Sequence, residues 1–261
     1  MEKSILITGA ASGIGKETAL LFARRGWFVG AVDVNEPALK QLGEEIGAGN
    51  VLFKAADVTR PDSLQAVASA IGARTGGRLD ILFNNAGTLA MGHHQTIALE
   101  KQKGIVEVNL VGVLNGIACC LDLLKGTSGA RIINMSSASA LYGTPELAVY
   151  SATKAAVKAL TEALNIEFEP LGIHVCDILA PYVRTPMIVK AAVAATSVTR
   201  LGVHLGPQDV ARVVWRAAHG KKVHWDVGFM MRLLRVSAML FPFAQRPLVK
   251  MLGFSSSTTP T

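Results

Sequence analysis

Ser4-Ile5-Leu6-Ile7-Thr8-Gly9-Ala10-Ala11-Ser12-Gly13-Ile14-Gly15 is the stretch from which the architecture of this 261-residue chain can be read. Its first part is a short apolar run, which is typical of a strand buried on both faces of a sheet. Its second part holds three glycines and opens a helix with periodic apolar residues that extends to about Arg25. Glycines let the backbone turn tightly and approach a ligand closely, and the free N–H groups of a helix N-terminus favour phosphate. This strand–turn–helix context predicts a dinucleotide-binding loop.

The rest of the chain alternates between strand-like and helical segments. Strands are expected at about 27–34, 51–55, 79–83, 131–135 and 173–179, and helices at about 36–46, 62–74, 99–125 and 149–169. Strands that alternate with helices of this length indicate βαβ units and a parallel sheet. With no linker or repeat, the pattern predicts a single α/β domain over residues 1–254, a Rossmann-type doubly wound parallel sheet with helices on both faces. The Ser/Thr-rich tail 255–261 is expected to be disordered.

Composition narrows the classes of function. Half of the residues are apolar, and the net charge of +7 comes from scattered Lys and Arg without a run of like charges, so we expect no nucleic-acid partner. The three cysteines form no C-x-x-C pair and no metal-like spacing with histidine, which favours free thiols in a reducing compartment and no metal. The N-terminus lacks a signal-peptide pattern, and no run of about 18 uncharged apolar residues occurs, so a cytoplasmic location without a spanning helix is expected.

Asp33 ends the second strand-like run, where a carboxylate can accept the ribose hydroxyls of a dinucleotide. The same carboxylate would repel a 2′-phosphate, because two unit charges about 4 Å apart cost about 4 kcal/mol at an effective dielectric constant near 20. We therefore expect NAD as the cofactor. NADP stays an alternative, since Lys16 offers some compensating charge. A strand-end aspartate that merely caps the next turn is the other reading of Asp33.

Tyr150-Ser151-Ala152-Thr153-Lys154 places a phenol and an ammonium one helical turn apart on the same face. An ammonium within about 4–6 Å typically lowers the pKa of a phenol by 1–3 units, towards the range in which general acid–base catalysis works. Ser137 ends the strand-like run 131–136 and supplies a hydroxyl that can bond a substrate oxygen. The Y-x-x-x-K spacing alone arises by chance in many helices, and it gains weight here from the upstream serine and the glycine-rich loop.

Taken together, these motifs resemble the short-chain dehydrogenase/reductase family over about residues 4–187. The matching motifs are T-G-x-x-x-G-I-G at Thr8–Gly15, Asp57-Val58, N-N-A-G at Asn84–Gly87, the helical Asn109, and Ser137 with Tyr150 and Lys154. The resemblance implies an enzyme that moves a hydride between a nicotinamide cofactor and a carbon bearing oxygen. It also implies a homodimer or homotetramer assembled through the helices 99–125 and 149–169.

The resemblance assigns roles to individual residues. Tyr150 would be the general acid/base, and Ser137 would orient the reacting oxygen. Lys154 would bind the nicotinamide ribose and lower the tyrosine pKa, and Asn109 would hold a water in the proton relay. The implied cofactor-binding residues are Gly9, Ser12, Gly13, Ile14, Gly15, Asp33, Asp57, Val58, Asn84, Ala86, Gly87, Tyr150, Lys154, Pro181, Val183 and Thr185.

Two departures from the family pattern concern the substrate side. Tyr182 stands where a glycine usually follows Pro181, which narrows the site or makes it aromatic. The frequent C-terminal V-D-G-G ending is absent, which weakens the interpretation as a ketoacyl reductase of fatty-acid synthesis. In its place comes an apolar, arginine-studded segment, 228–254. It is expected to cover the substrate site or a neighbouring subunit, or to lie on a membrane surface as an interfacial helix interrupted by Pro242 and Pro247.

The expected lid, about 186–206, is apolar, and further apolar residues are expected to face it: Leu89, Met91, Leu141, Tyr142 and Leu147. This favours a hydrophobic secondary alcohol or ketone, steroid-like or long-chain, although the same residues would also suit plain lid packing. The alternatives are an NADPH-dependent carbonyl reductase and a non-catalytic, dinucleotide-sensing protein on the same fold. Asp177, in a strand-like run, is expected to be a buried, hydrogen-bonded carboxylate.

Overall fold

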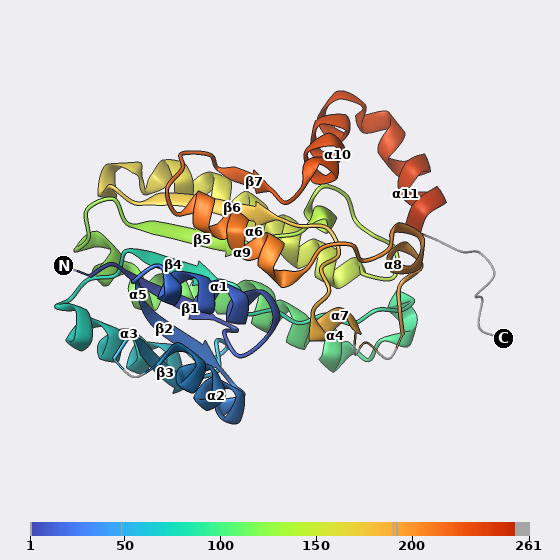
Figure 1. Ribbon diagram of the computed structural model, residues 1–261. Helices are drawn as coiled ribbons and strands as arrows, with labels where there is room; N and C mark the ends of the chain where they lie inside the picture. The colour runs from blue at the N-terminus through green and yellow to red at the C-terminus, as the bar shows by residue number, and fades with distance from the viewer. Residues whose placement is uncertain (1, 48, 190, 192, 254–261) are drawn as a thin grey trace.

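A computed structural model describes residues 2–47, 49–189, 191 and 193–253, and the expected disordered tail 255–261 lies outside this range. Within it, seven strands form one parallel sheet in the order β3-β2-β1-β4-β5-β6-β7 (Figure 1). The strands are β1 (Ser4–Thr8), β2 (Phe28–Asp33), β3 (Val51–Ala55), β4 (Ile81–Asn84), β5 (Arg131–Met135), β6 (His174–Leu179) and β7 (His224–Asp226). The predicted α/β class with a doubly wound parallel sheet is confirmed.

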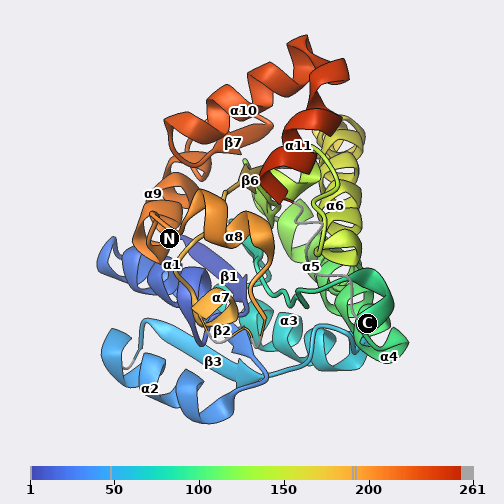
Figure 2. The same cartoon turned by 90° about the vertical axis from the view of Figure 1, so that its right-hand side faces the viewer.

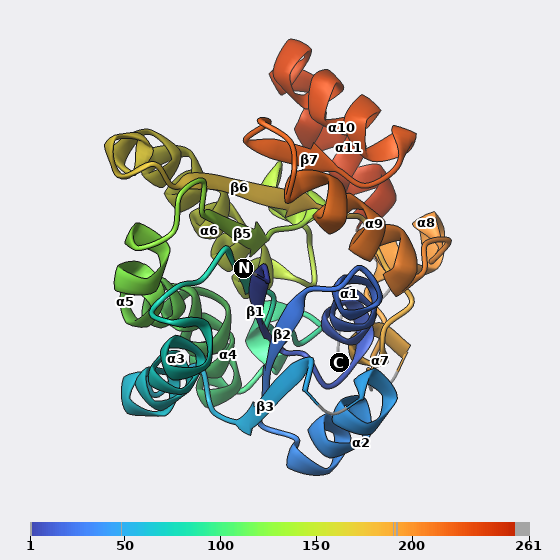
Figure 3. The same cartoon turned by 60° about the vertical axis from the view of Figure 1, so that its left-hand side comes forward.

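Helices cover both faces of the sheet (Figure 3). One face carries α1 (Gly13–Arg24), α2 (Glu36–Ile46) and α9 (Pro207–Ala217), and the other carries α3 (Pro61–Thr75), α4 (Leu99–Val106), α5 (Gly112–Lys125) and α6 (Ala148–Glu167). Successive side chains of a strand point to opposite faces, so Ile5 and Ile7 join one apolar core and Leu6 joins the other. This double burial is why the strands are continuously apolar.

The strand order reverses between β1 and β4. From β1 the chain builds outward through β2 and β3 on one side, and then returns to β4 on the other side of β1. At such a switch point the connections after the two strands leave in opposite directions and open a crevice at the carboxyl ends of the strands. Thr8 ends β1 and Asn84 ends β4, so the glycine-rich loop and the N-N-A-G segment begin side by side.

The expected long helix 99–125 is present as α4, a π-helical turn (Glu107–Val111) and α5 in succession. By length and composition alone, Leu99–Lys125 is apolar enough to cross a membrane, although the sequence has no uncharged apolar run of about 18 residues. In the structure this helix packs against α3, α6 and the sheet, and it carries the fully buried Asn109. It is a core helix of the domain.

The chain beyond β6 builds over the carboxyl end of the sheet. The expected lid contains α7 (Pro186–Val189) and α8 (Thr196–Leu201). After β7, α10 (Phe229–Leu240), the short 3₁₀ helix η5 (Pro242–Ala244) and α11 (Gln245–Gly253) rise from the sheet and return to α8 (Figures 1 and 2). We call residues 228–253 the C-terminal arch. Pro242 separates its two helices as expected, but Pro247 does not interrupt it, because it lies in the first turn of α11, where a helix needs no N–H.

Three further 3₁₀ turns complete the described chain, namely η1 (His94–Thr96), η3 (Ala138–Ala140) and η4 (Glu169–Leu171).

Candidate active site

The glycine-rich loop after β1 folds back on itself so tightly that Gly9 and Gly15 have no room for a side chain. A Cβ atom at Gly15 would lie 2.0 Å from the carbonyl oxygen of Gly9, and a Cβ at Gly9, whose φ is +67°, would lie 2.8 Å from the Cα of Ala86. Glycine adopts this left-handed conformation without the cost that other residues meet. The N-terminus of α1 therefore stays open to a ligand, as a pyrophosphate requires.

The segment after β4 braces this loop. The Asn85 side-chain amide donates hydrogen bonds to the carbonyl oxygens of Thr8 and Gly9, at 3.0 and 3.1 Å. In return, the Thr8 hydroxyl accepts from the backbone N–H groups of Asn85 and Ala86, both at 3.0 Å. Asn85 was not among the predicted site residues. The N-N-A-G motif contained it, but the sequence does not show which of the two asparagines turns towards the loop.

A cavity of about 400 Å³ extends from this loop to the Tyr150–Lys154 helix. The predicted residues that line it are Gly9, Ser12, Gly13, Ile14, Asp33, Ala86, Gly87, Ser137, Tyr150, Lys154, Pro181, Val183 and Thr185. Its walls also include two of the apolar residues expected at the substrate, Leu89 and Leu147, together with Tyr182 and Ile188. The predicted residues outside its walls are Gly15, Asp57, Val58, Asn84 and Asn109.

Asp33 ties the end of β2 to the glycine-rich loop. One carboxylate oxygen accepts a hydrogen bond from the Ala11 backbone N–H, and the other accepts from the Asn35 N–H, both at 3.0 Å. Asp33 therefore stabilises the turn that follows it, as the alternative interpretation held, and it also lines the cavity. The two roles are compatible, because an ionised carboxylate has about four lone-pair sites.

Asn84, Asp57 and Val58 make contacts within the protein. The Asn84 amide donates to the Asn134 side chain across the β4–β5 pair at 3.0 Å, and its own oxygen has no hydrogen-bond partner among the described residues. Asp57 accepts from the N–H and hydroxyl of Thr59, and Val58 packs in the core. Cofactor contacts from these three residues stay predictions.

The catalytic candidates meet at the far end of the cavity. Tyr150 and Lys154 lie on α6, with the Lys154 Nζ 5.7 Å from the centre of the tyrosine ring. Ser137, just after β5, forms a hydrogen bond with the Tyr150 phenol and also accepts one from the Ser139 N–H. Lys154 is buried, and its Nζ donates to the Met135 carbonyl at 2.7 Å. The fold thus brings together the hydroxyl, phenol and ammonium that the motifs predicted.

The pKa of Tyr150 moves against expectation. Burial raises it to about 12, although the hydrogen bond from Ser137 acts in the opposite direction. Burial also lowers the pKa of Lys154 to about 8. The prediction that Lys154 brings a net lowering of the phenol pKa is wrong for this arrangement. The cause is that both groups are desolvated, which disfavours the phenolate and the ammonium alike.

Asn109 lies in the π-helical turn and fixes the loop after β4. Its side-chain oxygen accepts from the Thr88 N–H at 2.8 Å, while its amide donates to the Thr88 carbonyl at 2.9 Å and to the Thr153 hydroxyl at 3.2 Å. Both amide hydrogens are therefore used within the protein. A water held by Asn109 would have to bind through one of its oxygens, and the proton relay stays a prediction.

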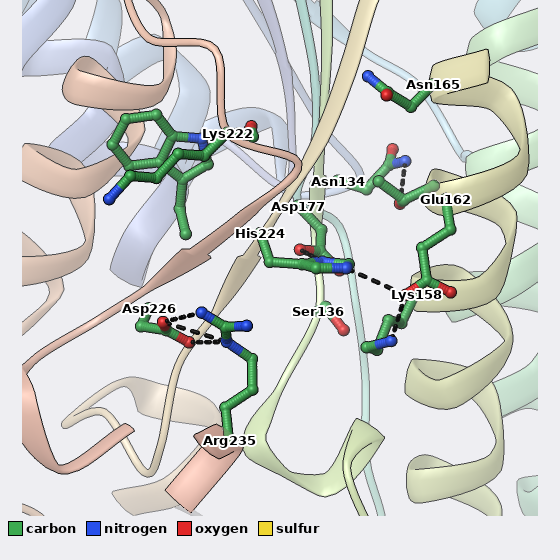
Figure 4. Close-up of polar contacts among 12 residues, drawn as sticks. Asn134, Ser136, Lys158, Glu162, Asn165, Asp177, Lys222, His224, Asp226 and Arg235 are labelled. Atoms are coloured by element: carbon green, nitrogen blue, oxygen red, sulfur yellow. Dashed lines mark hydrogen bonds and ion pairs between the residues drawn. The ribbon is translucent and has the colours of Figure 1, made fainter. Parts of the chain in front are cut away.

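Asp177 forms a separate polar network beside β7 (Figure 4). The fully buried carboxylate lies 2.8 Å from the His224 Nδ1, and the His224 Nε2 lies 3.0 Å from Glu162, which pairs with Lys158. Burial raises the pKa of Asp177, and the hydrogen bond to Asp177 raises the pKa of His224. The expected buried, hydrogen-bonded carboxylate is confirmed, and it joins β6 and β7 to α6 without lining the cavity.

The residues present fit a dinucleotide, because the glycine loop forms a cradle that a Cβ would fill and Asp33 stands at its edge. The same cavity holds a phenol, a hydroxyl and an ammonium suited to proton transfer at a substrate oxygen. This combination defines a nicotinamide-dinucleotide-dependent oxidoreductase acting on alcohol or carbonyl groups.

Comparisons with known proteins identify the family. The family model described as short chain dehydrogenase matches residues 3–194. The cyclohexanol dehydrogenase of Acinetobacter sp. (strain SE19) is 33% identical over 219 residues, covering 81% of this chain and 86% of that protein. The 3-oxoacyl-(acyl-carrier-protein) reductase FabG of Thermotoga maritima is 33% identical over 218 residues, covering 81% and 88%.

Among solved structures, the 3-ketoacyl-(acyl-carrier-protein) reductase from Brucella melitensis complexed with NADH superimposes with a TM-score of 0.78 at 31% identity, covering 86% of this chain and 96% of that one. The chain belongs to the short-chain dehydrogenase/reductase family. Members of this family bind NAD(H) or NADP(H) and small-molecule substrates, and they usually form oligomers.

The Gly9 contact yields a test of the dinucleotide loop. Gly9→Ala forces a Cβ against the Ala86 backbone at positive φ, and we expect NADH affinity, measured by fluorescence titration, to fall at least tenfold. Gly26→Ala is the matched control, because Gly26 has a similar φ of +75° with nothing within 4 Å of the added atom. Equal NADH affinity in the two variants would show that the loop does not depend on this close approach.

The buried lysine predicts a pH dependence of stability. The pKa of Lys154 is about 8 in the folded protein and about 10.4 in an unfolded chain, so between these values the unfolded state binds more protons and the free energy of unfolding rises with pH. Between pH 7 and 9.5 we expect the wild type to gain about 2 kcal/mol relative to Lys154→Met, measured by urea denaturation. A difference between the two proteins that stays constant over this range contradicts the prediction.

Proposed function

We propose that this protein is an NAD-dependent oxidoreductase that interconverts a hydrophobic secondary alcohol and its ketone. The proposal rests on one observation: the same cavity is lined by both groups of residues. Asp33 and the glycine loop form one group, and Ser137, Tyr150 and Lys154 form the other. The first group suits the adenosine half of a dinucleotide, and the second suits chemistry at an oxygen-bearing carbon.

The proposed chemistry assigns one task to each catalytic candidate. Ser137 hydrogen-bonds the reacting oxygen and holds it beside the phenol. Tyr150 is protonated at neutral pH and donates this proton to a carbonyl oxygen during reduction. During oxidation its phenolate form receives the proton of the alcohol, and the raised pKa of Tyr150 disfavours that form in the free protein. Lys154 contributes an ammonium beneath the tyrosine ring. A bound nicotinamide would supply the hydride chemistry, and the positive charge of its oxidised form would favour the phenolate of Tyr150.

The proposed preference for NAD is supported by Asp33, which lines the cavity and whose carboxylate would repel a nearby 2′-phosphate. Lys16, which the sequence offered as compensation, forms an ion pair with Glu45 at 2.6 Å. That pairing reduces the charge available to a phosphate and supports NAD over the NADPH alternative.

The hydrophobic substrate is supported by the walls near Tyr150. Leu89, Leu147, Tyr182 and Ile188 line the cavity there, and they belong to a small apolar cluster that includes the lid residues Ala195 and Val198. The named relative that acts on cyclohexanol is consistent with an apolar secondary alcohol, and cyclohexanol is a sensible first substrate. A protein that only senses a dinucleotide is the weaker alternative, because it would not need Ser137, Tyr150 and Lys154 together in the cavity.

We also propose a reducing, cytoplasmic setting and a homodimer or homotetramer. The three cysteines are free thiols, which supports the first. For the second, α5 and α6 carry exposed apolar side chains such as Leu114 and Ile166, and the outer face of the C-terminal arch exposes Phe229 and Met239. Because members of the family usually form oligomers, we propose that a second copy of the chain covers these faces. Contact of the arch with a membrane surface is the alternative, supported by Arg232 and Arg246 beside the apolar residues.

Replacing the phenol tests the enzymatic role. Tyr150→Phe removes the proton-transfer group while keeping the ring, and we expect kcat for cyclohexanol oxidation with NAD to fall by about 10²–10⁴, the usual contribution of general acid–base catalysis. NADH affinity should stay within twofold, because the phenol oxygen lies at the substrate end of the cavity. Full turnover by Tyr150→Phe would refute the assignment.

Replacing the carboxylate tests the cofactor preference. Asp33→Asn keeps an oxygen that can accept from the Ala11 or Asn35 N–H but removes the charge, so the loop should keep its shape. We expect NADH to bind at least tenfold more weakly and NADPH more tightly than in the wild type, measured as paired dissociation constants. A wild type that already prefers NADPH, or an unchanged ratio in Asp33→Asn, would favour the carbonyl-reductase alternative.

A further inference from the structure

A second cavity, of about 310 Å³, lies under the C-terminal arch and borders the catalytic serine. One side is formed by the arch, through residues such as Leu234, Phe241 and Leu248. The other side is formed by the domain, through Ser137 and Tyr182. Ser137, Pro181 and Tyr182 also line the first cavity, so the two spaces meet at the residues beside the reacting centre.

The arch is fixed to the domain at both ends. Near its start, the Arg235 guanidinium makes a bidentate ion pair with Asp226 of β7, with N–O distances of 2.8 to 3.2 Å (Figure 4). Near its end, the Arg200 guanidinium of α8 donates to the Met251 carbonyl of α11. A bidentate arginine–carboxylate pair fixes geometry as well as supplying energy. The space beneath the arch is therefore held by specific contacts at both ends.

The walls of this second cavity select an uncharged, apolar ligand. Within the described part of the chain they contain no charged side chain, and several of their polar groups are already paired. The Tyr182 hydroxyl bonds the Ser197 hydroxyl at 2.6 Å, and the Gln245 amide donates to the Ala238 carbonyl at 2.7 Å. A polar ligand group that met these paired groups would lose its hydration without a full replacement, which costs free energy.

Tyr182 stands at the junction of the two cavities. Its ring lines both spaces, and its bond to Ser197 holds the ring against α8. This is the position where the family resemblance led us to expect glycine. A substrate whose reacting oxygen is held by Ser137 and Tyr150 in the first cavity would direct its longer substituent past this ring and under the arch.

We propose that the cavity under the C-terminal arch binds the apolar substituent of the substrate, an aliphatic or alicyclic group attached to the carbon that is oxidised or reduced. The assignment of the ligand as substrate rests on the proposed function. The arch acts as the wall that sets how long this substituent can be, and the arginine contacts at its ends are positioning residues for that wall.

The test is the binding of 2-alkanones of increasing length, from 2-butanone to 2-decanone, to the full chain with NAD present so that no turnover occurs. Each methylene that enters an apolar site contributes about 0.8 kcal/mol, so we expect the dissociation constant from equilibrium dialysis to fall about fourfold per added carbon until the cavity is full. Dissociation constants that do not change with chain length overturn the proposal.

Two phenylalanine variants on α10 locate the effect. Ala238 lines the cavity, and Ala238→Phe fills it, so we expect 2-decanone to bind at least tenfold more weakly while 2-butanone is unaffected. Val236, which is 41% exposed and does not line the cavity, provides the matched control in Val236→Phe, which should bind both ketones like the wild type. An equal response of the two variants, or an Ala238→Phe defect that is the same for both ketones, overturns the proposal.

Turnover separates this inference from the proposed function. Oxidation of 2-butanol or cyclohexanol with NAD depends on Tyr150 and should survive in Ala238→Phe, whereas kcat/KM for 2-decanol should fall. If short alcohols are oxidised but ketone binding does not depend on chain length, the proposed function is supported and the assignment of the second cavity is refuted. If ketone binding depends on chain length but no alcohol is oxidised, the proposed enzymatic function is refuted, and the cavity under the arch is still supported as a site for an apolar ligand.

Discussion

The close packing of Gly9 against Ala86 is the contact on which the remainder of the site depends. It joins the loop after β1 to the segment after β4, the two strands between which the sheet order reverses. The hydrogen bonds from Asn85 to this loop then fix its carbonyl groups, so the N–H groups at the start of α1 remain available. A side chain at Gly9 would push apart the two halves of the sheet at the point where a dinucleotide has to cross between them.

Burial, more than the pairing of charges, sets the electrostatics of the catalytic end. Lys154 is buried and donates to the Met135 carbonyl, so its ammonium is anchored to β5. The phenol of Tyr150 carries its proton at neutral pH, which suits donation to a carbonyl oxygen, and its raised pKa further disfavours the phenolate. Abstraction of a proton from an alcohol needs additional positive charge near the ring. The free protein therefore holds this phenol in its acid form.

The amino-acid sequence was sufficient to predict those features of the fold and the site that depend on residues close together in the chain. Apolar runs located β1 to β6, and the glycine loop and the Tyr150–Lys154 turn depend on neighbours within one or two turns. The sequence was insufficient to predict side-chain orientations and pKa values that depend on distant parts of the chain. Whether Asn84 or Asn85 faces the loop is decided by the residue at which β4 ends, because successive side chains of a strand alternate between faces. The pKa of Tyr150 depends on burial by segments that close over it, and no spacing within α6 reveals that.

The second cavity combines a part of the chain that the family model matches with a part that follows it. The family model ends at residue 194, before α8 and the C-terminal arch, so the second cavity is built largely from chain beyond it. Tyr182 connects the two parts, since it follows β6 within the matched region but bonds to Ser197 outside it. A glycine at this position would leave α8 without that bond and the cavities without a partition. Tyr182 and the arch therefore act together in our proposal, in which the reaction centre is joined to a wall for the apolar substituent of the substrate.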